Sequence, residues 1–322
     1  MNTIITLNDI INAKKRIFPY ITHTPLIFSD NLSKILNCNI YIKPEMLQTT
    51  GSFKIRGASN KILSLSESEL KKGIICNSSG NHGKACAYMG HKLGIKSIVI
   101  MPDTILQSKI DDIESLGGTA ILAGGYYEDR LEILENMCKT YGYTHVHPYE
   151  DPLIMAGQGT CGLEILDDLP SVDTIIAPVG GGGLISGVSV AAKSVNSSIT
   201  TIGVQPEVSA AYVASRRAGH PVEVGCPHTL GDALCQRNPG KNPYPVIERY
   251  VDILDDVSED MIYNATKIFA RETHLLAEPS SCVGLALLLS HKYIPKNNEN
   301  IVLIVTSGNW PIDGLGKIYA NV

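Results

Sequence analysis

Four short segments join glycine to hydroxyl, amide or amine side chains, and each follows a candidate strand or opens a candidate helix. They are residues 50–58 (Thr-Gly-Ser-Phe-Lys-Ile-Arg-Gly-Ala), 78–83 (Ser-Ser-Gly-Asn-His-Gly), 180–183 (four glycines) and 306–309 (Thr-Ser-Gly-Asn). In α/β proteins, ligands bind beyond the carboxyl ends of the strands, where such loops meet. We therefore interpret the four segments as parts of one ligand site.

The first segment carries a lysine that is suited to chemistry. Lys54 stands between the apolar residues Phe53 and Ile55, at the start of a helical run. Burial would disfavour its ammonium form and leave the amine free to act as a nucleophile or base. The alternative is an ordinary surface lysine at a helix start, and only the other three segments argue against it.

The second segment opens a helix directly after the apolar residues 74–77. Backbone N–H groups at a helix N-terminus favour an anion such as a carboxylate, and the Ser and Asn side chains add further donors. Ser79 or Asn81 could instead serve only as a helix cap. The segment alone leaves both interpretations open.

The third segment consists of Gly180, Gly181, Gly182 and Gly183, and it joins an apolar strand to a helix that starts near residue 184. Four glycines let the backbone wrap an oxyanion with several N–H groups. A dinucleotide fingerprint fails on spacing, because its last glycine would fall on Ile185 or Ser186. A plain turn would not require the conformational entropy that four glycines cost.

Composition excludes several classes of protein. The 322 residues are 44% hydrophobic and 18% charged, with a net charge of −5 and no basic run longer than residues 14–16. A nucleic-acid partner is therefore not expected, nor is a membrane span, because no apolar run approaches the roughly 20 residues required. Without an export signal the chain is expected to be cytoplasmic. Its eight cysteines lack a CxxC pair, so we expect buried, reduced thiols, with a disulfide or zinc site as the less favoured alternative.

Short β-branched runs alternate with longer helical patterns, which predicts parallel sheets covered on both faces. Strands are expected at residues 39–43, 74–77, 97–101, 119–123, 144–147, 173–179, 200–204 and 301–306, and helices at 81–93, 107–116, 128–141, 157–168, 184–195 and 259–272. Gly94, Gly117 and Gly142 follow helices, where a residue with positive φ is wanted. We predict an α/β protein with a small domain (66–150) inserted into a large one (1–65 and 151–322).

Seven segments, in order along the chain, resemble the threonine dehydratase and serine racemase branch of the fold-type II pyridoxal-phosphate enzymes. They are residues 23–26, 43–58, 78–83, 156–160, 178–183, 278–279 and 306–309. The resemblance implies two parallel-sheet domains of the tryptophan-synthase-β type. It also implies pyridoxal 5′-phosphate as cofactor, a small amino acid as substrate, and a homodimer or homotetramer.

The resemblance also assigns roles to residues. Lys54 would hold the cofactor covalently and act as the base, while the glycine loop would bind the phosphate. Other cofactor contacts are expected from Phe53 on the ring face, Asn81 at the 3′-oxygen, Thr306 at the ring nitrogen, and Glu278 nearby. The substrate carboxylate would meet Ser78, Ser79 and His82. Ser79 is also the residue that a racemase would use as its second acid or base, and Arg130 is placed to meet a second carboxylate.

Two departures from the racemase pattern bear on the reaction. Gln205 and Ala211 stand where metal-dependent racemases have carboxylates, so no metal site is expected. Tyr149 occupies a position that is aromatic in many dehydratases. The expected activity is therefore an L-threonine/L-serine dehydratase that makes a 2-oxo acid and ammonia by α,β-elimination.

Other activities stay open as alternatives. A serine or aspartate racemase and a 3-hydroxyaspartate dehydratase share the same chemistry. A β-replacement synthase fits less well, because its lysine segment is usually Ser-Val-Lys-Asp-Arg rather than Ser-Phe-Lys-Ile-Arg. A non-catalytic sensor would be expected to lose Lys54 or the glycine loop, and both are present.

Overall fold

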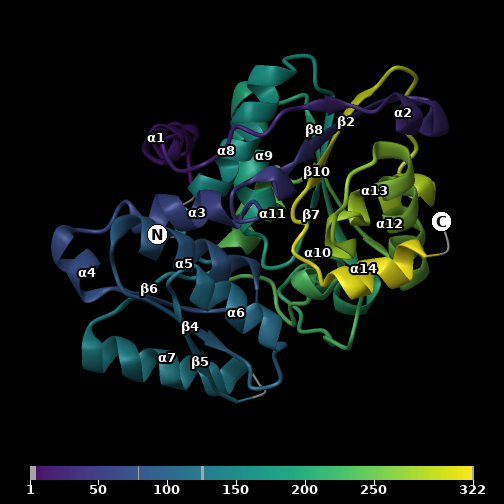
Figure 1. The fold of residues 1–322 in the computed structure, drawn as a ribbon. Helices are drawn as coiled ribbons and strands as arrows, with labels where there is room; N and C mark the ends of the chain where they lie inside the picture. The colour runs from purple at the N-terminus through teal and green to yellow at the C-terminus, as the bar shows by residue number, and fades with distance from the viewer. Residues whose placement is uncertain (1–4, 79, 125–126, 321–322) are drawn as a thin grey trace.

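The computed structural model describes residues 5–78, 80–124 and 127–320, and its strands form two sheets (Figure 1). Across the six-stranded sheet lie β1 (Ile27–Phe28), β2 (Asn39–Pro44), β10 (Asn300–Val305), β7 (Thr174–Pro178), β8 (Thr200–Pro206) and β9 (Ile253–Val257). Across the four-stranded sheet lie β5 (Thr119–Leu122), β4 (Ser97–Met101), β3 (Ile74–Asn77) and β6 (Thr144–His145). Within these sheets the pairing is parallel, apart from β1, which runs antiparallel to β2. The predicted fold class is confirmed.

Helices cover both sheets. They are α1 (Leu7–Ile17), α2 (Asp30–Leu36), α3 (Lys54–Ile62), α4 (Glu67–Lys72), α5 (Asn81–Leu93), α6 (Gln107–Ser115), α7 (Tyr127–Tyr141), α8 (Pro152–Asp168), α9 (Gly183–Val195), α10 (Ala211–Ala218), α11 (Pro243–Tyr250), α12 (Glu259–Thr273), α13 (Val283–Leu289) and α14 (Ile312–Tyr319). Short 3-10 turns lie at Glu45–Leu47, Glu207–Ser209, Asp232–Leu234 and Pro279–Ser281. No helix among the described residues has the length and apolarity needed to span a bilayer.

The large sheet is buried on both faces, because its central strands β10, β7 and β8 are mostly apolar and are buried at nearly every position. In β10, Val302 and Ile304 face a core formed with α8 and α9, whereas Ile301, Leu303 and Val305 face a second core formed with α12 and α13. Figure 1 shows α8 and α9 on one side of this sheet and α12 and α13 on the other. This is the arrangement that continuous apolar strands predict.

The small sheet is built in the same way. Its two faces bury separate clusters, one toward α5 and α6 and one toward α7. The first cluster also takes in Ile55, Ala58 and Ile62 of α3, so the helix that begins at Lys54 packs against the small sheet. The domain boundaries near residues 65 and 150 stay a prediction.

Helix ends follow the sequence signals, with one exception. Gly94, Gly117 and Gly142 have φ values of 64°, 77° and 71°, which confirms the predicted left-handed positions. The helix predicted from residue 157 instead begins at Pro152, because Asp151 accepts a hydrogen bond from the Leu153 N–H (2.8 Å) and caps it there. A proline in the first turn suits this start.

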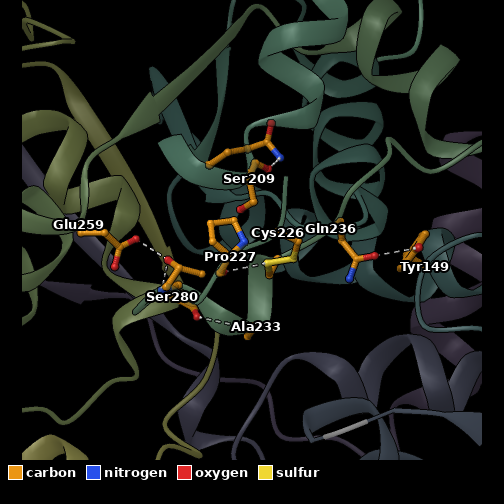
Figure 2. Close-up of a disulfide and its surroundings, with 12 residues drawn as sticks. Tyr149, Ser209, Cys226, Pro227, Ala233, Gln236, Glu259 and Ser280 are labelled. Carbon is orange, nitrogen blue, oxygen red and sulfur yellow. Dashed lines mark hydrogen bonds between the residues drawn. A yellow bond between two sulfur atoms is a disulfide. The ribbon is translucent and has the colours of Figure 1, made fainter. Parts of the chain in front are cut away.

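The cysteines correct one expectation. Cys226 and Cys235 are joined in a disulfide, with Cα atoms 5.7 Å apart, so the expectation of reduced thiols is wrong for this pair (Figure 2). The fold of the segment between them brings the sulfurs together, and a nine-residue separation carries no sequence signal for it. The other six are free, and five of them are buried.

Candidate functional site

A cavity of about 700 Å³ lies at the carboxyl ends of β3, β7 and β10, between the two sheets. The predicted site residues that line it are Phe53, Lys54, Ser78, Asn81, His82, Arg130, Gly180, Gly181, Gly182, Gly183, Glu278 and Thr306. Ser79 lies outside the described residues. Segments more than 250 residues apart thus meet at one place, as expected for loops that follow parallel strands.

Lys54 is the first residue of α3, and its Nζ lies 3.1 Å from the Pro148 carbonyl oxygen. Burial lowers the pKa of this amine to about 8, against the opposing influence of Cys86 and Glu278. The Nζ atom also lies 5.2 Å from the centroid of the Phe53 ring. A large share of the amine is therefore neutral near pH 8, as a nucleophile or base requires.

The glycine loop forms an anion cradle at the N-terminus of α9. Gly182 has a φ of 89°, a left-handed conformation that side chains disfavour, and a Cβ at Gly180 would lie 3.2 Å from the Leu234 Cα. The Tyr212 hydroxyl donates a hydrogen bond to the Gly181 carbonyl oxygen (2.9 Å), so this oxygen is already paired within the protein. The first N–H groups of a helix have no acceptor within the helix, so they are available to an oxyanion.

Asn81 and Glu278 form a polar group opposite the lysine. The Asn81 Nδ2 lies 3.4 Å from both Glu278 oxygens, and its Oδ1 accepts hydrogen bonds from Ser307 (3.2 Å) and Asn309 (2.8 Å). Burial, followed by the charge of Asp232, raises the pKa of Glu278 to about 7. Glu278 can therefore hold or release a proton near neutral pH.

Thr306 ends β10 with its hydroxyl buried beside a second hydroxyl. Its Oγ1 lies 2.8 Å from the Ser281 Oγ, which donates to the Ser307 carbonyl oxygen (3.0 Å). Sequence reasoning missed Ser281. The only signal is its place two residues after Pro279, in the segment that also supplies Glu278.

The side chains of Ser78, His82 and Arg130, which are predicted to meet the substrate, form hydrogen bonds with other residues in this structure. The Ser78 Oγ accepts hydrogen bonds from the Gly80 and Gly83 N–H groups (3.3 and 3.1 Å), so it caps the start of α5. The His82 Nε2 lies 2.8 Å from the Val146 carbonyl oxygen, and burial lowers the pKa of this ring to about 3. Arg130 donates to Asn77 Oδ1 (2.9 Å) and to the Gly124 carbonyl oxygen (3.2 Å). Their contacts with substrate stay predictions.

Residues 17–307 match the family model described as pyridoxal-phosphate dependent enzyme. The chain belongs to this family. It is 38% identical to an L-threonine ammonia-lyase of Thermotoga maritima (98% of this chain, 78% of the relative) and 41% identical to a catabolic L-threonine dehydratase of Staphylococcus aureus (95% and 89%). The solved serine racemase of Dictyostelium discoideum superposes with a TM-score of 0.90 at 34% identity (96% and 100%). The resemblance stated from the sequence is confirmed.

The site fits pyridoxal phosphate, the cofactor of the family. A buried amine, a glycine cradle that side chains would fill, and a buried hydroxyl at a strand end face one cavity. These groups are of the kinds that would hold the aldehyde, the phosphate and the ring nitrogen of the cofactor, and their assignment to these atoms stays a prediction. A neutral hydroxyl such as that of Thr306 would not keep a ring nitrogen protonated as a carboxylate would.

A buried ion cluster, also missed from the sequence, positions the lysine helix of this pyridoxal-phosphate enzyme. The guanidinium of Arg56 donates to both oxygens of Glu45 (2.7 Å each) and both oxygens of Glu164 (2.7 Å each). The Lys43 Nζ lies 2.7 Å from Glu164 and completes a set of two cations and two anions. Because Arg56 stands two residues after Lys54, these bonds fix the start of α3.

Gln205 occupies the position where metal-dependent racemases of the family have a carboxylate. Its Oε1 accepts hydrogen bonds from the Tyr212 and Val213 N–H groups (2.8 and 3.2 Å), at the start of α10. Its Nε2 lies 3.3 Å from the Val179 carbonyl oxygen and 3.4 Å from that of Ser209. The amide thus supplies positive hydrogens to carbonyl oxygens that would otherwise suit a cation. The absence of a metal requirement stays a prediction.

Proposed function

We propose that this chain is an L-threonine/L-serine dehydratase, which removes water and then ammonia from the amino acid to give a 2-oxo acid. The observation that carries the proposal is the meeting of the Lys54 amine, the glycine cradle and the Thr306 hydroxyl in one cavity. The curated relatives named above support the choice of substrate.

Each part of the site has a task in this reaction. When bound, pyridoxal phosphate supplies an electron-withdrawing ring that acidifies the substrate Cα–H bond. Lys54, with its pKa near 8, takes the Cα proton. The glycine loop holds the phosphate against the start of α9, and α5 presents its N-terminus to the substrate carboxylate.

The hydroxyl at Thr306 favours elimination. It does not stabilise a protonated ring nitrogen as a carboxylate would, so a long-lived negative charge at Cα is disfavoured and prompt loss of the β-hydroxyl is favoured. The α-proton and the hydroxide leave as water, and the resulting enamine takes up water to give the 2-oxo acid and ammonia. Gln205 supports the same choice, because it replaces a carboxylate of the racemases' metal site with a neutral amide.

A direct assay tests the proposal. Purified protein is incubated separately with L-threonine, L-serine and L-threo-3-hydroxyaspartate, and both the 2-oxo acid and the D-enantiomer are measured. We expect 2-oxo acid from L-threonine and L-serine with little D-isomer. D-serine formation without oxo acid would replace the proposal with a racemase. Oxo acid from 3-hydroxyaspartate alone would assign Arg130 to a second carboxylate.

A further inference from the structure

Residues 226–241 form one wall of the cavity and begin at the disulfide. Cys226, Leu234, Cys235, Gln236 and Asn238 all line the cavity. In Figure 2 the sulfur–sulfur bond lies between Ser280, on one side of this segment, and Tyr149, on the other. We call residues 226–241 the crosslinked wall.

The crosslinked wall contacts the glycine loop and two tyrosines beside the cavity. Leu234 approaches Gly180 closely: a Cβ at the glycine would lie 3.2 Å from the Leu234 Cα, so a side chain there would require the wall to shift slightly. The Gln236 Oε1 accepts a hydrogen bond from the Tyr149 hydroxyl (3.1 Å), and the Gly240 N–H donates to the Tyr212 hydroxyl (2.9 Å). The position of the wall therefore determines the shape of the cavity beside the glycine loop.

Besides the disulfide, one backbone bond and one exposed ion pair join the two ends of the loop that it closes: the Val224 N–H donates to the Arg237 carbonyl oxygen (2.8 Å), and Arg237 pairs with Glu223. The first half of the loop is attached to α12 through Glu259, which accepts hydrogen bonds from the Thr229 hydroxyl and the Leu230 N–H. The Ala233 N–H donates weakly to the Ser280 hydroxyl (3.3 Å). Without the sulfur–sulfur bond, only the Val224–Arg237 backbone bond and the exposed Arg237–Glu223 pair among the described residues would join the two ends, and the wall would gain conformations that a covalent crosslink removes.

The two sulfurs differ in access from the five buried cysteines. Cys226 is exposed and Cys235 half-buried, whereas five of the six free cysteines are buried and the sixth, Cys138, is half-buried in α7. Disulfide exchange requires a thiolate to reach a sulfur atom, so accessibility favours this pair over the five buried cysteines, and Cys138 is not bonded to another cysteine. In reducing compartments, the disulfides that do occur are usually catalytic or redox-sensing.

We propose that Cys226 and Cys235 are a reversible thiol–disulfide site that sets how tightly the cavity holds its amino-acid substrate. A dithiol reductant attacks one sulfur, and its second thiol then releases the mixed disulfide. The two cysteines together gain two electrons and two protons, and the dithiol becomes a disulfide. The oxidised state keeps the wall ordered against the glycine loop, whereas the reduced state must order the wall on binding substrate.

The redox state is measured without any assay of turnover. Trypsin cleavage after Arg217 and Arg237 places both cysteines in one peptide, residues 218–237. The oxidised peptide resists alkylation and is lighter than the reduced peptide by the mass of two hydrogen atoms. We expect the holoenzyme to yield the oxidised peptide after treatment with oxidised glutathione and the reduced peptide after treatment with dithiothreitol. A peptide that stays fully alkylatable after oxidation overturns the proposal.

The functional consequence is measured on the same two samples. It rests on the proposed dehydratase activity. We expect reduction to raise the KM for L-threonine about fivefold and to change kcat less than about twofold, because preorganisation acts on binding. The visible absorbance of the bound cofactor should stay unchanged. An equal KM in both redox states, or a lower KM after reduction, overturns the proposal.

Two variants separate the pair from other effects of the reagents. The double variant Cys226→Ser/Cys235→Ser should keep the KM of the reduced enzyme in both reagents, and Cys138→Ser should keep the full redox response. A double variant that still responds overturns the proposal. If the enzyme turns over L-threonine in neither redox state, the proposed function fails. Trypsin digestion of the native protein then tests whether reduction loosens the crosslinked wall. Cleavage at the exposed Arg237 should be faster after reduction, and equal rates overturn the proposal.

Discussion

The Lys54 amine combines burial, a pKa of about 8 and a position at the start of α3. Lys54→Ala should therefore abolish the visible absorbance of the lysine-bound cofactor and reduce oxo-acid formation by at least about 10³-fold, as for loss of a nucleophile and base. Lys54→Arg should behave alike, because it keeps only the charge. The exposed Lys92→Ala serves as a control with normal activity. A borohydride-reducible cofactor bond in Lys54→Ala would assign the cofactor to another lysine.

Gly181 tests the phosphate cradle. A Cβ there would collide with the Tyr149 ring, so any side chain disturbs the loop. Gly181→Asp and Gly181→Asn have nearly the same shape, and they differ in a negative charge where N–H groups should meet the phosphate. We expect the Asp variant to bind the cofactor at least about tenfold more weakly than the Asn variant, or about 1.4 kcal/mol. Equal cofactor affinities in a titration would move the phosphate elsewhere.

Gln205 carries the prediction about metals. The native protein should show the same activity and melting temperature in EDTA as in millimolar Mg²⁺ or Ca²⁺. Gln205→Glu replaces the NH₂ group and its two N–H donors with one oxygen that faces two carbonyl oxygens. We expect it to lose about 1–3 kcal/mol of stability in EDTA and to recover part of it with Ca²⁺, which favours carboxylate and carbonyl ligands. A several-fold dependence of the native enzyme on divalent ions would contradict the prediction.

Most of the residues foreseen at the site share one signal, which is a polar or glycine-rich loop that follows an apolar strand or opens a helix, whereas Arg130 and Glu278 were foreseen only from the family resemblance. Ser281 and Gln236 lack that signal. Ser281 reaches Thr306 through a turn whose path depends on α13, and Gln236 reaches Tyr149 only because the wall folds back over the cavity. Contacts of this kind depend on tertiary structure, so the sequence predicts the loops but not their partners.

At the scale of elements, the inner strands were predictable because most of their positions are apolar, and their boundaries are shifted by at most two residues. β9 escaped prediction because Asp255 and Asp256 interrupt its apolar pattern, which an edge strand tolerates. β1 has only two residues and adds to the opposite edge. Edge strands bury less surface and so leave a weaker pattern.

The ion cluster beneath α3 gives the prediction at this scale. Arg56→Met leaves Glu45 and Glu164 buried with fewer partners, which should reduce the free energy of unfolding by about 3–5 kcal/mol. Arg56→Lys cannot reproduce the fork that bonds both carboxylates and should recover little of the loss. The control is Arg271→Met, whose pair with Glu272 is partly exposed and should be worth less than about 1 kcal/mol. Similar losses in urea unfolding for Arg56→Met and Arg271→Met would contradict the prediction.

At the scale of the whole molecule, the site exists only where the two sheets meet. Lys54 and the glycine loop lie on either side of a cavity whose walls come from both sheets, and α3 packs against the small sheet while its ion cluster binds it to α8. The order of segments along the chain predicts that the loops converge. It does not predict which helix joins the two sheets, because that depends on packing between surfaces far apart in sequence.

Titratable groups are also buried where the two sheets meet. Their pKa values predict how the stability of the cofactor-free protein changes with pH. Burial, reinforced by the charge of Lys54, lowers the pKa of His82 and His147 from 6.5 to about 3, and burial raises that of Glu278 from 4.5 to about 7. As the pH falls from 6.5 toward 4.5, the unfolded chain takes up protons on both histidines while the folded chain does not, so stability falls. Glu278 acts in the opposite sense, because its folded form takes up a proton first.

The net difference from these three groups is about one proton, which contributes a fall of about 1.4 kcal/mol per pH unit to the free energy of unfolding between roughly 4.5 and 6.5, and His145, whose pKa burial also lowers, adds to this fall. His147→Asn keeps an acceptor for the Tyr149 and Glu150 N–H groups but removes one titration. Its slope in this window should therefore be smaller than the native slope by about 1.4 kcal/mol per pH unit, whereas Glu278→Gln should increase the slope by a similar amount. Urea unfolding at several pH values measures all three. A native slope that survives in His147→Asn would show that other groups control the acid response.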